Sequence, residues 1–388
     1  MSWEKVKLID CCVSIADGDH QPPPKSETGI PFVTIANIVN NQFDFTNSMF
    51  VPNYYYEKLD SKRKAQRGDI LYSVVGSFGI PVFIKDNKPF VFQRHIAILR
   101  PNGNIDARFL YYTMLSRDFY MKADAAAIGA AQRTVSLTAL RNIEITVPPI
   151  ETQRRIADIV SAYDDLIENN RKQIKLLEEA AQRLYKEWFV DLRFPGHVHT
   201  KITDGVPEGW KRRKLVDIAQ VQYGYAFDGS LFNSQKIGTP IIRIRNIPQG
   251  QTEDYTPENV DSQYLVYNGD IIVGMDGEFH INTWAGDTAY LGQRTFRIKA
   301  LTSDLNGFLL WAIYEPIKYF EKTVVGATVA HLGKKHIDTV EILVPTEKFY
   351  LPFKSLFEAR LLLMNQNRAL AEARDRLLPK LMSGEVEV

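Results

Sequence analysis

The sequence predicts an α/β protein with two pseudo-symmetric mixed α/β domains, each built on a curved, mostly antiparallel sheet and separated by two long helices in an antiparallel coiled coil. Three observations support this prediction. The chain repeats itself after about 200 residues, the first part of each copy contains short apolar runs, and the second part carries apolar residues at helical spacing. The predicted domains are 1–150, 151–194, 195–345 and 346–388, of which the second and fourth are the long helices.

The duplication rests on six short motifs that recur in the same order. The pairs are W-x3-K-L-x-D at Trp3 and Trp210, G-x-P at Gly29 and Gly238, G-D-I at Gly68 and Gly269, Q-R at Gln93 and Gln293, [IV]-E-I-x-V-P at Ile143 and Val340, and N-R at Asn170 and Asn367. Any one pair is weak evidence alone, but six in one order indicate two copies of a single unit.

The first part of each copy has the pattern of a sheet domain. In the first copy, apolar runs at 31–38, 70–75, 80–84 and 96–99 are rich in β-branched residues and are interrupted by Gly, Pro, Asn and Asp. Such runs predict strands. A stretch at 109–121 predicts a helix between them.

The second part of each copy predicts a coiled-coil helix, because apolar residues recur at alternating steps of three and four. We expect the first helix to end at Pro195-Gly196, and Pro379 to end or kink the second. The predicted seam is Ile156, Val160, Tyr163, Ile167, Asn170, Ile174, Leu177, Ala181, Leu184 and Trp188 in the first helix, and Leu356, Leu363, Leu370 and Leu377 alternating with Arg360, Asn367 and Arg374 in the second.

An antiparallel pair would bury both apolar stripes, because each helix follows its own domain along the chain. Asn170 and Asn367 interrupt the two stripes at matching positions of the repeat. They either fix the register of the pair or lie solvated at the edge of the seam. The sequence leaves both interpretations open.

Composition excludes several classes of protein. The chain has 388 residues, of which 45% are hydrophobic and 24% charged, so it is neither disordered nor of low complexity. Its two cysteines, Cys11 and Cys12, are adjacent, which excludes a disulfide scaffold and fits a reducing cytoplasm. No apolar stretch is long and unbroken enough to predict a membrane span. The net charge of +1 means that bulk electrostatics alone does not indicate nucleic-acid binding.

The sequence carries no recognisable catalytic motif. Neither a P-loop nor an H-E-x-x-H or C-x-x-C spacing occurs, and the seven histidines are scattered. We therefore predict no catalytic residue, no metal site and no cofactor in this chain, and expect a binding or scaffolding protein.

Several of these motifs together resemble the specificity subunits of type I restriction-modification systems. The resemblance covers the whole chain and rests on the W-x3-K-L-x-D starts, on V-P-P-I-E-T-Q at Val147, on L-Y-K-E-W-F-V-D at Leu184, and on R-L-L-P-K-L-M-S-G-E at Arg376. The second copy departs from the P-P-x-x-E-Q pattern, with Val344-Pro345-Thr-Glu347 in its place.

The resemblance implies that each domain is a target-recognition domain that reads one half of a bipartite double-stranded DNA site. It also implies two methyltransferase subunits as partners and a nuclease-translocase subunit for restriction. S-adenosylmethionine, Mg²⁺ and ATP would then belong to the partner subunits. Two other classes stay open, namely a self-contained DNA-modifying enzyme and a structural scaffold that does not bind DNA.

Side chains that could read bases follow the predicted strands of both copies. Arg pairs with guanine, whereas Asn and Gln pair with adenine. The candidates are Asn37, Asn40, Gln93, Arg94, Gln132 and Arg133 in the first copy, and Arg243, Arg245, Asn246, Gln293, Arg294 and His331 in the second. Residues common to both copies have capping of turns as their alternative role. We therefore favour Gln132, Arg133, Arg243, Arg245 and His331, with the loops 18–25 and 275–280 as further candidates.

Overall fold

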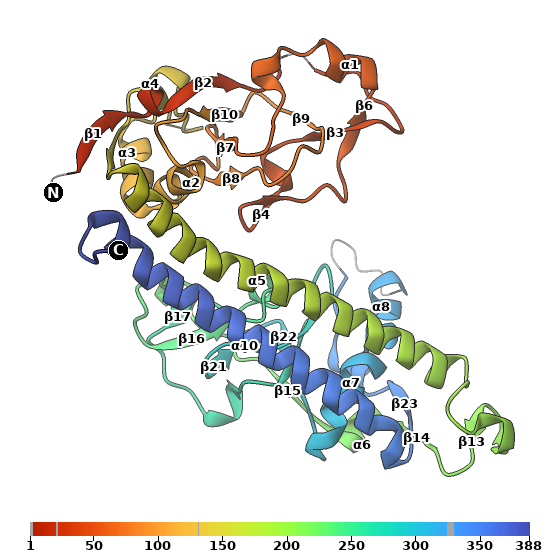
Figure 1. Ribbon diagram of the computed structural model, residues 1–388. Helices are drawn as coiled ribbons and strands as arrows, with labels where there is room; N and C mark the ends of the chain where they lie inside the picture. Colours follow the sequence, from red (N-terminus) through yellow and green to blue (C-terminus); the bar gives the residue numbers. More distant parts are fainter. Residues whose placement is uncertain (1–2, 21, 131, 324–329) are drawn as a thin grey trace. The chain divides into compact units, whose positions relative to one another are not determined.

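The computed structural model describes residues 3–20, 22–130, 132–323 and 330–388 and confirms the predicted α/β fold class (Figure 1). The chain divides into two units, of which unit 1 is Met1–Asp165 with Ala371–Val388 and unit 2 is Leu166–Leu370. Each unit combines one globular copy of the repeat with a portion of both long helices. The domain limits at 150, 194 and 345 remain predictions.

A four-stranded antiparallel sheet forms the centre of each unit, and its topology is the same in both. The strand order is β2-β10-β7-β8 in unit 1 and β15-β22-β19-β20 in unit 2. In unit 1 the strands are β2 (Cys12–Asp17), β7 (Ile70–Ser73), β8 (Pro81–Phe83) and β10 (Ile96–Pro101). In unit 2 they are β15 (Ala219–Tyr223), β19 (Ile271–Gly274), β20 (Ile281–Thr283) and β22 (Thr295–Ala300).

A second sheet accompanies the central one in each unit, three-stranded in the order β6-β3-β9 in unit 1 and four-stranded in the order β17-β16-β21-β18 in unit 2. Its β3–β9 and β16–β21 pairs are parallel, in contrast to the antiparallel central sheet. The strands are β3 (Ile30–Val33), β6 (Met49–Val51), β9 (Val91–Phe92), β16 (Thr239–Ile242), β17 (Tyr255–Thr256), β18 (Leu265–Val266) and β21 (Ala289–Leu291). The hairpins β4 (Ile38–Val39) with β5 (Gln42–Phe43), and β12 (Ile202–Thr203) with β13 (Val206–Pro207), stand apart.

The predicted strand at 31–38 is too long. The chain leaves β3 after Val33 and makes a 3₁₀ turn at Ile35–Asn37 before β4 begins. The side chain of Asn37 causes this interruption, because its Oδ1 accepts the backbone N–H of Thr34 at 2.9 Å.

The repeated W-x3-K-L motif has the same structural role in both units. It forms a short strand, β1 (Glu4–Lys7) or β14 (Lys211–Lys214), that pairs with β11 (Glu144–Val147) or β23 (Glu341–Val344). The following leucines, Leu8 and Leu215, are fully buried. Their N–H groups donate to the carbonyls of Ile143 and Val340, so the motif recurs because it joins the start of each domain to its last strand.

The predicted helix at 109–121 is two helices. Asp106 caps the first at its start, and Ser116 both ends it and caps the second, accepting the N–H of Phe119 at 3.2 Å. The short helices of the units are α1 (Asn53–Lys58), α2 (Ala107–Leu115), α3 (Arg117–Ala125), α4 (Leu137–Arg141), α6 (Leu215–Ile218), α7 (Asn306–Ala312), α8 (Tyr314–Thr323) and α9 (Lys334–Ile337).

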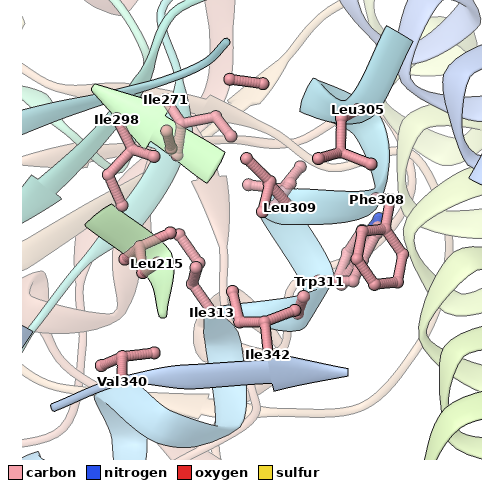
Figure 2. Packing of buried hydrophobic residues seen from close by; sticks show 14 of the residues in the cluster. Leu215, Ile271, Ile298, Leu305, Phe308, Leu309, Trp311, Ile313, Val340 and Ile342 are labelled. Atoms are coloured by element: carbon pink, nitrogen blue, oxygen red, sulfur yellow. The ribbon is translucent and has the colours of Figure 1, made fainter. Parts of the chain in front are cut away.

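Each unit has its own apolar core. In unit 2, α7 lays Phe308 and Leu309 against the central sheet at Ile271 and Ile298, and β23 adds Ile342 (Figure 2). All five side chains are buried. The hydrophobic effect therefore joins sheet, helix and closing strand in one cluster, which holds the loops at the end of the sheet in place.

The long helices end at different residues from those predicted. The first, α5 (Ile150–Tyr185), continues as a π-helical turn at Lys186–Val190 and ends before Pro195. The second, α10 (Glu347–Ser383), continues through Pro379, so the predicted end at this proline is wrong, whereas the alternative of a kink stays a prediction. Leu378 and Leu381, on either side of this proline, are buried in the core of unit 1, and this packing offsets the lost backbone hydrogen bond. No helix among the described residues is long and apolar enough to cross a membrane.

The two long helices pack antiparallel within unit 2. Asn170 of α5 donates to Gln366 of α10, Glu178 pairs with Arg360, and Trp188 packs on Phe353. Residue numbers thus rise along α5 while they fall along α10. In unit 1, Asp164 of α5 pairs with Arg374 of α10, which is a further pair of the same kind.

The predicted seam residues differ in burial. Ile156, Val160, Ile167, Asn170 and Ala181 are buried. Partly buried seam residues are Tyr163, Ile174, Leu177, Leu184, Leu356, Leu363, Asn367, Leu370 and Leu377.

Other residues supply much of the buried face of α10. These are Phe349, Phe353 and Phe357, which belong to the apolar core of unit 2, and the predicted seam residue Arg360 is buried beside them.

Candidate nucleic-acid interface

Three segments meet at one end of the central sheet in each unit. In unit 1 they are the turn 74–80 between β7 and β8, the turn 93–95 between β9 and β10, and the segment 128–135 apart from residue 131; we call them rim 1. Backbone hydrogen bonds tie them together, since Val74 donates to His95 and Gly76 donates to Arg133.

Unit 2 builds the same feature from equivalent segments. Rim 2 consists of 275–280, 292–294 and 330–333, and Met275 connects all three. Its N–H donates to Arg294 and its carbonyl accepts from Leu332. The isolated bridges Val75–Thr134 and Asp276–His331 mark matching places in the two rims.

Rim 1 carries Gln132 and Arg133 next to an aromatic pair. The Arg133 guanidinium lies 2.9 Å from Asp124 Oδ1 and 5.9 Å from the centre of the Phe78 ring. Phe78 in turn stacks on Tyr120 with ring centres 5.7 Å apart. Arg133 is therefore oriented by an ion pair and a cation–π contact, while about half of its side chain stays exposed.

Rim 2 brings Arg294 and His331 together on one carboxylate. Arg294 Nη1 lies 2.6 Å from Asp276 Oδ2, and His331 Nδ1 lies 2.6 Å from Asp276 Oδ1. The backbone of Arg294 has a φ of +66°, in the left-handed region that L-residues rarely adopt. The turn thus holds Arg294 in a specific conformation beside Asp276.

The contacts among Asp276, Arg294 and His331 shift pKa values in rim 2. Burial acts to raise the pKa of Asp276, but the hydrogen bonds from His331 and Arg294 outweigh it and bring the pKa below its usual value. The same contact raises the pKa of Arg294. Asp276 is therefore ionised at neutral pH and holds a positive charge at the rim.

Asn37 and Asn246 close equivalent turns. As Asn37 does for Thr34, Asn246 accepts the N–H of Arg243 at 2.8 Å. Their amide groups donate to Asp44 and Asp254, respectively. In the described structure both ends of each amide are used locally.

The neighbouring candidates of unit 2 are held to differing extents. Arg245 places Nε and Nη2 on the carboxylate of Asp254, so much of its hydrogen-bonding fork is occupied. Arg243 lies with its guanidinium 5.3 Å from the Phe232 ring. No hydrogen bond or ion pair of the described residues links the side chains of Asn37, Asn40, Arg243, Arg245 or Asn246 to a rim.

The remaining candidates lie in turns. Asn40 is exposed at the tip of the β4–β5 hairpin with a φ of +51°. Gln93 and Arg94 belong to rim 1, and Gln293 lies exposed in rim 2 beside Arg294. Of the two loops that differ between the copies, 275–280 is part of rim 2, whereas 18–25 includes residue 21, which lies outside the described residues.

Sequence reasoning missed the residues that orient the rim arginines. Asp124 and Tyr120 lie on α3, where Asp124 pairs with Arg133 and Tyr120 stacks on Phe78, and nothing in their spacing indicates these contacts. Asp276 gave a weak signal as part of a loop that differs between the copies, but an acidic residue is not an obvious component of a DNA-binding surface. Among the described residues no group of His, Cys, Asp and Glu could hold a metal ion.

Comparison with known proteins gives one family. The profile described as "Type I restriction modification DNA specificity domain" matches residues 2–179 and 207–348. The specificity subunit of type I restriction enzyme MjaIX from Methanocaldococcus jannaschii is 25% identical over all of this chain and 94% of the relative. That of HindI from Haemophilus influenzae is 23% identical over 92% of this chain and 94% of the relative.

A solved structure shares the fold. The crystal structure of the type I restriction-modification S subunit from M. genitalium superposes with a TM-score of 0.57 at 16% identity, and covers 98% of this chain and 96% of that one. At this level of identity the match supports the fold alone.

Proposed function

The chain belongs to the family of type I restriction-modification DNA specificity subunits, and from that premise we propose that each unit reads one half of a bipartite DNA target through its rim. In this proposal the chain is a targeting subunit and performs no chemistry itself. It positions two methyltransferase subunits for adenine methylation, and a nuclease-translocase subunit where restriction occurs.

The observation that carries the proposal is one rim built twice with different side chains. At the equivalent segments 128–135 and 330–333, unit 1 presents Gln132 and Arg133 and unit 2 presents His331, whereas the pair Gln93-Arg94 recurs in unit 2 as Gln293-Arg294. Two surfaces of one design that differ in hydrogen-bonding groups suit two different half-sites, because base identity is read by donors and acceptors at base edges.

The charge of the chain supports shared DNA binding. Affinity for DNA comes largely from Lys and Arg that neutralise phosphates, and a net charge of +1 supplies little of this. The partner subunits would therefore contribute most phosphate contacts. They would also hold S-adenosylmethionine, Mg²⁺ and ATP, for which we assign no site in this chain.

The proposal is tested by mapping methyladenine in the genome of a host that contains the partner subunits, once with and once without the gene for this chain. We expect a bipartite motif with two unlike halves that disappears when this chain is absent. Methylation of adenine by the purified chain alone would instead indicate a self-contained enzyme. Failure of the complex to select any sequence from a random DNA library would support a scaffold.

The helices provide a separate test, because α5 and α10 each begin in one unit and end in the other. Insertion of seven residues, about 10 Å of helix, into both should lengthen the gap of the recognised motif by about three base pairs. An unchanged gap in the methylation map would show that the helices do not set it.

A further inference from the structure

Asp276 anchors two candidate base-reading side chains at once. Each of its carboxylate oxygens lies 2.6 Å from a different partner, Arg294 or His331. The Asp276 side chain is only 15% exposed, whereas those of Arg294 and His331 are 60% and 56% exposed. A nearly buried carboxylate therefore fixes the inner ends of two side chains whose outer ends are in solvent.

The outer ends of this pair carry hydrogen-bonding groups. His331 uses Nδ1 for Asp276, which leaves Nε2 facing away from the carboxylate. Arg294 uses Nη1, and its Nε and Nη2 have no hydrogen-bond partner among the described residues. Arginine donors match the two acceptors on the major-groove edge of guanine, and an imidazole nitrogen can bond to a neighbouring base.

Ordering of these side chains before binding favours discrimination between bases. An arginine held in one orientation presents its donors to one arrangement of acceptors and cannot swing to fit another base, so a wrong base leaves donors without partners. We infer that Asp276 is a positioning residue that holds Arg294 and His331 as one preordered reading pair for the half-site of unit 2. This inference rests on the proposed function and names the determinant of specificity within it.

Unit 1 lacks this arrangement. The repeat places Val75 at the position of Asp276, and the bridge partner of Val75 is Thr134. Arg133 is oriented instead by Asp124 from α3. A change at Asp276 should therefore affect one half of the recognised motif and leave the other half as it is.

The experiment is methyladenine mapping with the full chain and its methyltransferase partners, and compares wild type with Asp276→Asn. We expect the preference for the favoured base over its alternatives to fall about tenfold at one or two positions of one half-site. Affinity for random-sequence DNA should stay equal or rise, because the substitution removes a negative charge. Uniform loss of methylation over all sites would overturn the inference.

Glu278→Gln is the matched control, since it removes the same charge from the same turn and Glu278 contacts neither Arg294 nor His331. We expect it to leave the motif unchanged, and a shift equal to that of Asp276→Asn would overturn the inference. Arg294→Gln and His331→Ala avoid the buried carboxylate and should alter the same half-site. If neither alters it, the inference is wrong.

The proposed function and the role of Asp276 are refuted by different outcomes. A wild-type chain that yields no bipartite motif would refute the proposed function. A wild-type motif that Asp276→Asn leaves intact would refute only the role of Asp276.

Discussion

Unit 1 and unit 2 attach their globular parts to the same two helices through different polar contacts. In unit 1, Asp164 of α5 accepts from Tyr112 of α2 at 2.7 Å and pairs with Arg374 of α10 at 2.5 Å. In unit 2 the central residue belongs to α10 instead, because Arg360 bonds to Asn282 at 2.6 Å and to Glu178 of α5 at 2.7 Å.

A second difference lies within the central sheets. The repeated G-D motif ends with a buried aspartate that closes a turn by accepting the N–H of Gln66 in unit 1 or Tyr267 in unit 2. Asp69 makes a two-pronged pair with Arg100 at 2.9 and 3.1 Å, whereas Asp270 lies 3.7 Å from Arg297. The two copies thus share the hydrogen bonds that close backbone turns, whereas their ion pairs differ in geometry and position.

The largest expected effect concerns Arg360, which joins α10 to the globular part of unit 2. Arg360→Ala should lower the free energy of unfolding of unit 2 by about 3 kcal/mol, because the Arg360 side chain is 8% exposed and its loss leaves Glu178 and Asn282 without their partner. Arg374→Ala should cost unit 1 about 1 kcal/mol, since the Arg374 side chain is 22% exposed and loses less when its partner contact is removed. Urea unfolding with hydrogen exchange along α10 measures both.

A double replacement separates the ion pair from simple loss of packing. Glu178→Met with Arg360→Met removes both charges and keeps apolar volume, so it should recover much of the stability lost in Arg360→Ala. Equal destabilisation by Arg360→Ala and Arg374→Ala would mean that burial does not distinguish the two contacts.

The next largest expected effect is a difference in stability loss between substitutions of the two aspartates of the G-D motif. Asp69→Asn should destabilise unit 1 by about 2 kcal/mol, because it removes the charge that pairs with Arg100. Burial raises the pKa of Asp270 above its usual value, so the charged form of this residue is a cost to the folded state at neutral pH. Asp270→Asn retains an oxygen for the Tyr267 N–H and should change stability by under about 1 kcal/mol.

The pH dependence of stability tests whether the cost at Asp270 comes from its charge. Because the folded-state pKa of Asp270 is raised, its unfavourable contribution is fully present at neutral pH and disappears as the pH falls through that pKa. Acidification toward pH 4 should therefore stabilise wild type relative to Asp270→Asn. A constant difference across this range would contradict the assignment of the cost to burial of charge.

The sequence predicted those features that repeat. Leu8 with Leu215, and Asp69 with Asp270, stand in the six motifs because each has a fixed place in a turn or strand end. The antiparallel helix pair was predictable because apolar stripes need a partner. Helix ends were less predictable, since packing of Leu378 and Leu381 overrides the helix-breaking tendency of Pro379.

The candidate site was predictable only in part. Gln132, Arg133, Arg294 and His331 were found from residue type, and the structure places each in a rim. Whether they contact DNA stays a prediction. The contacts of the supporting carboxylates Asp124 and Asp276 could not be predicted, because they join residues that lie 9 to 55 positions apart without any periodic pattern.

The smallest expected effect concerns Asn37 and Asn246, which both copies share. Each closes its turn by accepting one backbone N–H and donates a second hydrogen bond from its amide, so Asn37→Ala and Asn246→Ala should each lower the free energy of unfolding by about 1 kcal/mol in their own unit. Neither substitution should change the bases of the methylated motif, whereas Arg133→Ala should change them within one half-site only. Methylation maps and urea unfolding of the three variants make this comparison. If either Asn substitution shifted base preference while stability stayed the same, that residue would be a reader of DNA and not only a closure of its turn.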